Sequence, residues 1–229
     1  MTENQKRHRR RRKKPFPAAF LLFIIVILAV ICAVISAAAY YFSGGAAVDN
    51  GIAQYDNDGD EIEIPDWITV DLLPINEYSR PGEATDEIVG IVVHYVGNAG
   101  TSAEANRSYF AGLAVSGATY ASSNFIIGLE GEIIMCVPLG EIAYCSNSRN
   151  SDTVSIECCH PDETGEFTDE TYDSLVKLCA WLSELYDLTP TEDIIRHYDV
   201  TGKLCPLWYV EHEDEWETFK GEVADAMNG

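Results

Sequence analysis

A long stretch without charge, directly after a dense basic cluster, is the feature that most constrains this chain. No residue from Ala18 to Phe42 is charged. About 20 apolar residues are enough to cross the hydrocarbon core of a bilayer as a helix. We therefore expect a transmembrane helix over residues 18–42, preceded by a basic tail at residues 1–17.

The basic cluster predicts the orientation of this helix. Eight of the 15 Lys and Arg residues fall between Lys6 and Lys14. Because positive residues beside a first apolar segment stay in the cytoplasm, the chain after Phe42 should lie outside the membrane. A cleavable signal peptide is the alternative, since small residues occupy positions 36–39, but its apolar region usually spans only about 7–15 residues.

The rest of the chain is strongly acidic. The formal net charge is −22, with 37 Asp and Glu residues, and only seven basic residues (15 minus 8) follow Lys14. An acidic surface repels phosphates, so a nucleic-acid partner is excluded.

Composition predicts a linker after the apolar segment. We expect an acidic extracytoplasmic linker at residues 43–65, followed by a single domain at residues 66–229. Asp56, Asp58 and Asp60 alternate as in a calcium loop, but Gly59 is misplaced and the terminal Glu is missing.

The seven cysteines do not form a disulfide framework. One bridge remains open among Cys136, Cys145, Cys158, Cys159 and Cys179.

Alternating strand and helix patterns predict an α/β domain. An apolar run over residues 88–94 predicts a buried strand that ends at His94. In the expected strand 153–159, Glu157 and Cys159 share one face and Cys158 lies on the other. The other expected elements are a helix at 102–113, a hairpin of 124–128 and 133–137, a helix from Thr168, a short strand at 194–196 and an amphipathic C-terminal helix.

A histidine and a cysteine close together near the C-terminus indicate a metal site. Cys205 follows His197 by eight residues, with Lys203 between them. Imidazole and thiolate are good zinc ligands, and His94 is the natural third because strand ends converge at one sheet edge. Three protein ligands leave a position for water, whose pKa zinc lowers to about 7, so hydrolysis is the expected chemistry.

The alternatives to this site are structural. A lone His or Cys is more often part of a core than a ligand, and only the combination favours metal binding. Cys158, Cys159 and His160 form a rival cluster. Adjacent strand residues face opposite sides, however, and do not easily share one metal ion.

Three blocks together resemble the zinc-dependent N-acetylmuramoyl-L-alanine amidases, a family that includes phage lysozyme-type amidases and peptidoglycan recognition proteins. The blocks are residues 91–98, 154–159 and 196–206, within a resemblance over about 71–227. The resemblance implies a central mixed β-sheet flanked by helices. It also implies Zn²⁺ bound by His94, His197 and Cys205.

The resemblance assigns two catalytic residues. Glu157 matches the glutamate that serves as the base, and Lys203 matches the lysine two residues before the thiolate ligand. A carboxylate can accept a proton from water and pass it to the leaving amine, and an ammonium can stabilise an oxyanion.

The chain departs from the family at three positions. Ser123 stands where some relatives have a catalytic tyrosine, and Tyr120 lies nearby but out of register. Asn124 and Cys145 stand where relatives often carry histidine. We expect Asn124 to shape the substrate cleft.

The activity implied by the resemblance is cleavage of the amide between N-acetylmuramic acid and L-alanine of the stem peptide. The expected partners are peptidoglycan or muropeptides and, through the N-terminal helix, the bacterial cell membrane. A non-catalytic peptidoglycan-binding module and a zinc peptidase acting on the stem peptide remain alternatives, because cleft shape decides which bond is cut.

Overall fold

The computed structural model describes residues 61–228, which form helices packed on a six-stranded sheet. The strand order is β1-β4-β3-β5-β2-β6. Only the β3–β4 pair is antiparallel, so the sheet is mixed and the predicted α/β class is confirmed. The strands are β1 (Ile68–Val70), β2 (Ile91–Tyr95), β3 (Phe125–Ile127), β4 (Ile133–Met135), β5 (Val154–Cys158) and β6 (Ile194–Arg196).

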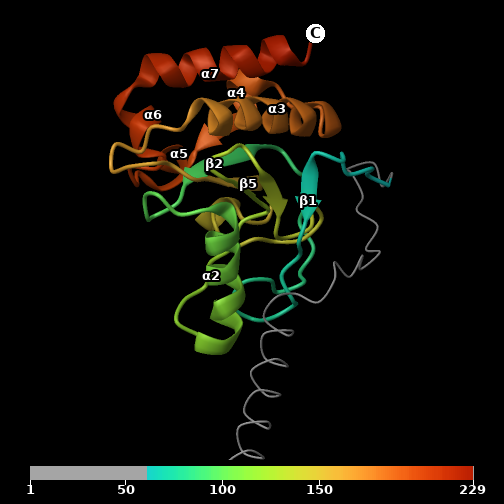
Figure 1. Ribbon diagram of the computed structural model, residues 1–229. Coiled ribbons are helices and arrows are strands. Elements are labelled where there is room, and N and C mark those ends of the chain that lie inside the picture. Colours follow the sequence, from blue (N-terminus) through green and yellow to red (C-terminus); the bar gives the residue numbers. More distant parts are fainter. Residues whose placement is uncertain (1–60, 229) are drawn as a thin grey trace, which may run out of the picture. The chain divides into compact units, whose positions relative to one another are not determined.

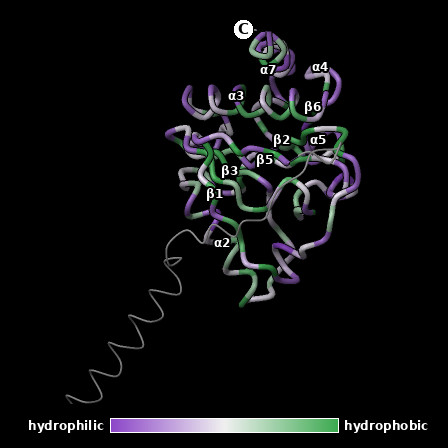
Figure 2. Tube along the Cα trace, turned by 90° about the vertical axis from the view of Figure 1, so that its right-hand side faces the viewer, coloured by the Kyte–Doolittle hydropathy of each residue, from purple (hydrophilic) through white to green (hydrophobic). Residues whose placement is uncertain are grey.

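Helices cover both faces of the sheet (Figure 1). Helix α2 (Ala103–Ser116) lies on one face, and α3 (Asp169–Leu185) with α7 (Glu213–Ala226) lies on the other. Figure 2 shows hydrophobic residues concentrated in the sheet and hydrophilic residues on the outer turns of the helices. The short elements are η1 (Asn147–Arg149), α4 (Pro190–Asp193), α5 (His197–Thr201) and α6 (Leu207–Glu211).

Local sequence signals account for the longer elements. The Ser102 side chain accepts from the Ala105 amide and caps α2, and the Thr168 side chain accepts from the Thr171 amide and caps α3. The turn between β3 and β4 contains Gly131 at φ 81°, where a Cβ would lie 2.8 Å from the Glu170 carbonyl oxygen. Only glycine fits this position, which keeps the hairpin close to α3.

Alternation along the strands divides the core in two. Ile91 and Ile156 belong to the cluster under α3 and α7, whereas Val96, Ile126 and Cys159 belong to the cluster under α2. Strand β3, with Phe125 in the first cluster and Ile126 in the second, supplies side chains to both layers, as its period of two requires.

The amino-terminal part of the domain contains a strand that the sequence patterns did not predict. Strand β1 pairs in parallel with β4 and forms a sheet edge. Ile62 is also buried in the larger core cluster, so residues of the expected linker join the fold. Within residues 61–228, no helix is long and apolar enough to cross a membrane; the segment predicted to do so, 18–42, lies outside the described residues.

Candidate active site

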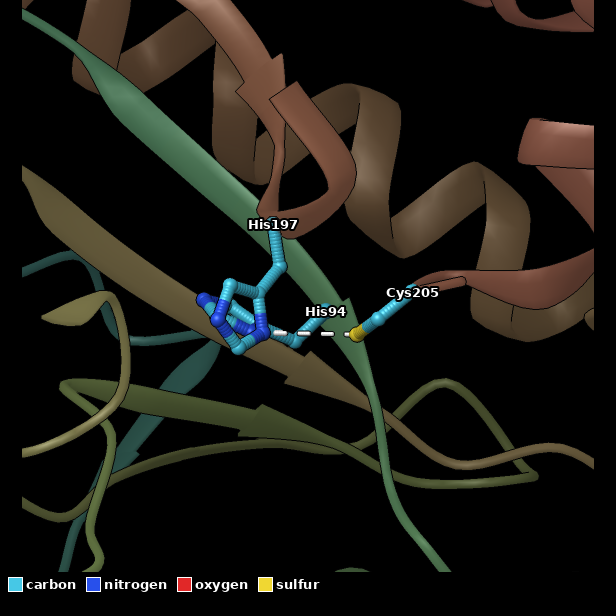
Figure 3. Close-up of side chains that lie close together, drawn as sticks. All are labelled: His94, His197 and Cys205. Carbon is cyan, nitrogen blue, oxygen red and sulfur yellow. Dashed lines mark hydrogen bonds between the residues drawn. The ribbon is translucent and has the colours of Figure 1, made fainter. Parts of the chain in front are cut away.

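The three predicted metal ligands converge at one end of β2. His94 lies near the end of β2, His197 begins α5 directly after β6, and Cys205 lies in the loop after α5. Their ligand atoms all lie within 4.8 Å of one another. Figure 3 shows the three side chains pointing toward a common point, with Cys205 Sγ 3.9 Å from His94 Nδ1.

The path from β6 to Cys205 explains how two ligands eight residues apart meet. Gly202 ends α5 at φ 78°, a left-handed conformation that glycine adopts without strain. The chain then reverses, and the Tyr198 amide donates to the Cys205 carbonyl oxygen at 2.9 Å. The reversal brings Cys205 back beside the first turn of the helix that carries His197.

Burial disfavours the charged form of both imidazoles. Burial lowers the pKa of His94 well below its usual value, and the charges of His197 and Lys203 lower it further. Burial also lowers the pKa of His197, with a smaller contribution from Lys203. A neutral imidazole keeps one nitrogen lone pair free to bind a metal ion.

Cys205 is a buried thiol whose deprotonation needs a cation. Burial raises its pKa to about 12, and the Glu157 charge acts in the same direction. The Tyr95 backbone amide and Lys203 oppose this by stabilising the thiolate. Metal binding replaces the thiol proton, so the donor set N, N, S suits a zinc ion.

Glu157 lies on the strand next to His94. The parallel register of β2 and β5 pairs His94 with Glu157 directly, and the alternation of both strands turns these side chains to the same face. Burial raises the pKa of Glu157 to about 7, against the opposing effects of Cys145 and Lys203. The Oε2 atom is buried without a hydrogen-bond partner in the described part of the chain. A carboxyl group with such a pKa can both accept and return a proton near neutral pH.

Lys203 is exposed at the rim of the site. Its positive charge lowers the pKa of His94, His197, Cys205 and Glu157. The residue can therefore stabilise negative charge that develops beside them.

Three other residues discussed for the family resemblance lie outside the group of converging side chains, two of them buried and one exposed. The Asn124 side chain is buried, accepts from the Ser155 amide and donates to the Pro138 carbonyl, so it links two segments of the fold. The Ser123 hydroxyl is buried and donates to the Phe125 carbonyl. Tyr120 is exposed and donates to Glu77.

The site also contains residues to which sequence reasoning gave no role. The Cys145 thiol donates to Glu157 Oε1 at 3.5 Å, and Cys145 forms a second possible metal-binding group with His94 and Glu157. Ser146 contacts His94, and Asn147 contacts His197. No periodicity or motif marks Ser146 or Asn147, because they lie in the connection between β4 and β5, at the start of the short helix η1.

The rival cluster is divided between different surroundings. Cys158 is packed under α3 and α7, whereas Cys159 is packed under α2. The His160 ring nitrogens contact the backbone carbonyls of Val96 and Asp162. The six cysteines of residues 61–228 are all free of disulfides.

A family model matches the segment that contains this site. The model described as N-acetylmuramoyl-L-alanine amidase covers residues 84–208, which include His94, Glu157, His197 and Cys205. The chain belongs to this amidase family. The resemblance inferred from the three sequence blocks is thus confirmed.

Curated relatives carry the same description. The N-acetylmuramoyl-L-alanine amidase BlyA of Bacillus subtilis (strain 168) is 29% identical over 181 residues, and CwlL of Bacillus licheniformis is 31% identical over 174 residues. The alignments cover 70% and 71% of this chain but 48% of each relative. The chain therefore spans about half the length of these relatives.

Solved structures share the fold of the amidase domain. The catalytic domain of XlyA has a TM-score of 0.57 and 24% identity, over 68% of this chain and 98% of that chain. PlyL has a TM-score of 0.58 and 22% identity, over 68% of this chain and 96% of that chain. At these identities the likeness concerns the fold alone.

Proposed function

We propose that this chain is a zinc-dependent N-acetylmuramoyl-L-alanine amidase that cleaves the amide between N-acetylmuramic acid and L-alanine of the stem peptide. The observation that carries the proposal is the convergence of His94, His197 and Cys205 beside Glu157. Membership of the amidase family and the names of the relatives support the substrate class.

The residues present fit a zinc ion. His197 Nδ1 is buried and has no hydrogen-bond partner within residues 61–228, an arrangement that costs stability unless something binds the lone pair. Ligand atoms of His94, His197 and Cys205 lie within 4.8 Å of one another. Three protein ligands of the imidazole and thiolate type, with a fourth position left open, are typical of catalytic zinc sites. A zinc ion held there supplies Lewis-acid chemistry at neutral pH.

Two residues of the chain transfer the proton and stabilise the negative charge of the reaction. Glu157 accepts a proton from the attacking water at its unpartnered Oε2 and returns it to the leaving nitrogen of L-alanine. Lys203 stabilises the negative charge on the oxygen of the tetrahedral intermediate. The carbon–nitrogen bond then breaks, leaving a free lactyl carboxylate and an L-alanine amino terminus.

The same proposal includes anchoring at the bacterial cell membrane. The apolar segment 18–42 and the basic cluster before it support a single N-terminal helix with the amidase domain on the outer side. The location suits a peptidoglycan substrate.

The test is to incubate the full-length protein with purified peptidoglycan, with and without a metal chelator, and to identify the new amino termini. We expect L-alanine amino termini that disappear with chelator and return with zinc. Cys205→Ser is the matched inactive control. New termini at other stem residues would identify a peptidase instead, and chelator-independent release would contradict the zinc mechanism.

A further inference from the structure

One turn between β4 and β5 contacts three residues of the site. The segment runs from Cys145 to Asn150. The Cys145 thiol donates to Glu157 Oε1 at 3.5 Å, the Ser146 hydroxyl lies 3.1 Å from His94 Nε2, and Asn147 Oδ1 lies 2.7 Å from His197 Nε2. Three consecutive side chains therefore reach three different site residues.

The turn is held by its own last residue. Asn150 Oδ1 accepts from the backbone amides of Cys145 at 3.2 Å and Ser146 at 2.6 Å. The Asn150 amide donates to the Asn147 carbonyl. Asn147 itself has a φ of 55°, the left-handed region that asparagine tolerates better than most residues. This conformation directs its carboxamide toward His197.

The contact with Asn147 selects one tautomer of His197. A carboxamide oxygen only accepts hydrogen bonds, so His197 Nε2 must carry the proton in this contact. In a neutral imidazole, Nδ1 is then the lone-pair nitrogen. That nitrogen is the buried atom without a partner among the described residues. His197 forms a possible metal-binding group with His94 and Cys205, so its free lone pair is the one available to a metal ion.

The contact with Ser146 is less selective. A hydroxyl can donate or accept, so the contact suits either tautomer of His94. It still places Nε2 against Ser146 and leaves Nδ1 facing Cys205 at 3.9 Å. Of the two contacts, the one with Asn147 therefore imposes the stronger constraint.

We propose that the Cys145–Asn150 turn positions the metal ligands, and that Asn147 is its principal positioning residue because it holds His197 with the Nδ1 lone pair toward the site. This inference rests on the proposed function for the identity of the metal. It deepens that function by naming residues outside the ligand set that prepare the site before the metal arrives.

The decisive variants exchange the Asn147 side chain while allowing its backbone conformation. Asn147→Gly removes the acceptor and suits a φ of 55°. Asn147→Asp keeps an acceptor at the same distance along the side chain and also tolerates this region. Asp187→Gly is the matched control, because Asp187 has a φ of 53° at an exposed position beyond the end of α3.

Two measurements on the full-length protein test how Asn147 positions His197, and neither depends on enzymatic activity. Imidazole ¹⁵N chemical shifts of the metal-free protein report the His197 tautomer, and competition with a chromophoric chelator gives the zinc Kd. We expect Asn147→Gly to lose the single tautomer and to weaken zinc binding by about 10- to 100-fold. Asn147→Asp should keep the wild-type tautomer and bind zinc at least as tightly, and Asp187→Gly should match the wild type in both measurements.

An Asn147→Gly protein with the wild-type tautomer and an unchanged zinc Kd would overturn the proposal. A failure of the proposed amidase function would give a different result from a failure of this proposal. A wild-type protein that binds zinc and leaves peptidoglycan uncut would contradict the amidase activity, while the tautomer and Kd comparison would still decide the role of Asn147. If the wild type bound no zinc, the ¹⁵N shifts alone would decide it.

Discussion

The two faces of strand β5 carry different kinds of residue. On one face, Val154 and Ile156 are fully buried in the core under α3 and α7. On the other face, the Ser155 hydroxyl donates a hydrogen bond to Asn124 Oδ1, and Glu157 Oε1 accepts a hydrogen bond from the Cys145 thiol. The apolar face contributes stability through burial, whereas the polar face contains a carboxyl group whose ionisation burial opposes.

This difference predicts that stability and chemistry can be separated at neighbouring positions of one strand. Substitutions on the site face should change activity with little loss of stability. Substitutions on the core face should do the reverse.

Cys205→Ser should have the largest effect. Because serine is a poor zinc ligand, we expect zinc binding to be lost and amidase activity to fall by at least about 100-fold. The melting temperature of the metal-free protein should stay close to that of the metal-free wild type, since the two side chains are similar in size. Metal analysis, a peptidoglycan assay and thermal unfolding check the three parts, and an active zinc-free variant would contradict the assignment.

Glu157→Gln should lower activity by about 100-fold or more, because loss of a general base typically costs 10²–10⁴-fold. Glutamine keeps the size of the side chain but accepts no proton. The zinc Kd should stay within a few-fold of the wild type, which distinguishes loss of the base from loss of a ligand. Equal losses of zinc and activity would instead make Glu157 a structural support of the metal site.

The stability of the metal-free protein should depend on pH through Glu157. Its pKa is about 7 in the folded state, against about 4.5 for an exposed Glu, so between these values the folded state holds a proton that the unfolded state releases. The contribution of Glu157 to the free energy of unfolding is therefore fully present below pH 4.5. It is lost as the pH rises toward 7, by up to about 1.4 kcal/mol per pH unit.

Urea unfolding in chelator, from pH 4 to 8, measures this dependence. The useful quantity is the free energy of unfolding of the wild type minus that of Glu157→Gln, because the contributions of other titrating groups largely cancel in this difference. The difference should fall with rising pH. A flat difference would mean that Glu157 is solvated in the folded protein.

Ile156→Val should have the smallest effect and lies on the core face, one residue before Glu157. Removing one buried methylene costs about 0.5–1.5 kcal/mol of unfolding free energy. Activity per folded molecule should stay within about two-fold of the wild type, because the side chain points away from the site. Chemical denaturation and the peptidoglycan assay check both, and a large loss of activity would show that the two faces are coupled.

Much of the fold could be predicted because its signals are local. The cap residues Ser102 and Thr168, the hairpin around Gly131 and the opposite faces of Cys158 and Cys159 all follow from short patterns. Strand β1 was missed as a strand because its three residues make one parallel pairing with β4, more than 60 residues further along the chain.

For the site, the sequence by itself determined which side chains are candidates for the chemistry. His94 at a strand end, the His197–Cys205 spacing and the inward-facing Glu157 follow from residue types and alternation. The tertiary structure decided how they meet. The register that places His94 beside Glu157, the burial of Asn124 and the turn that brings Asn147 to His197 depend on contacts between residues far apart in the chain, which no local pattern encodes.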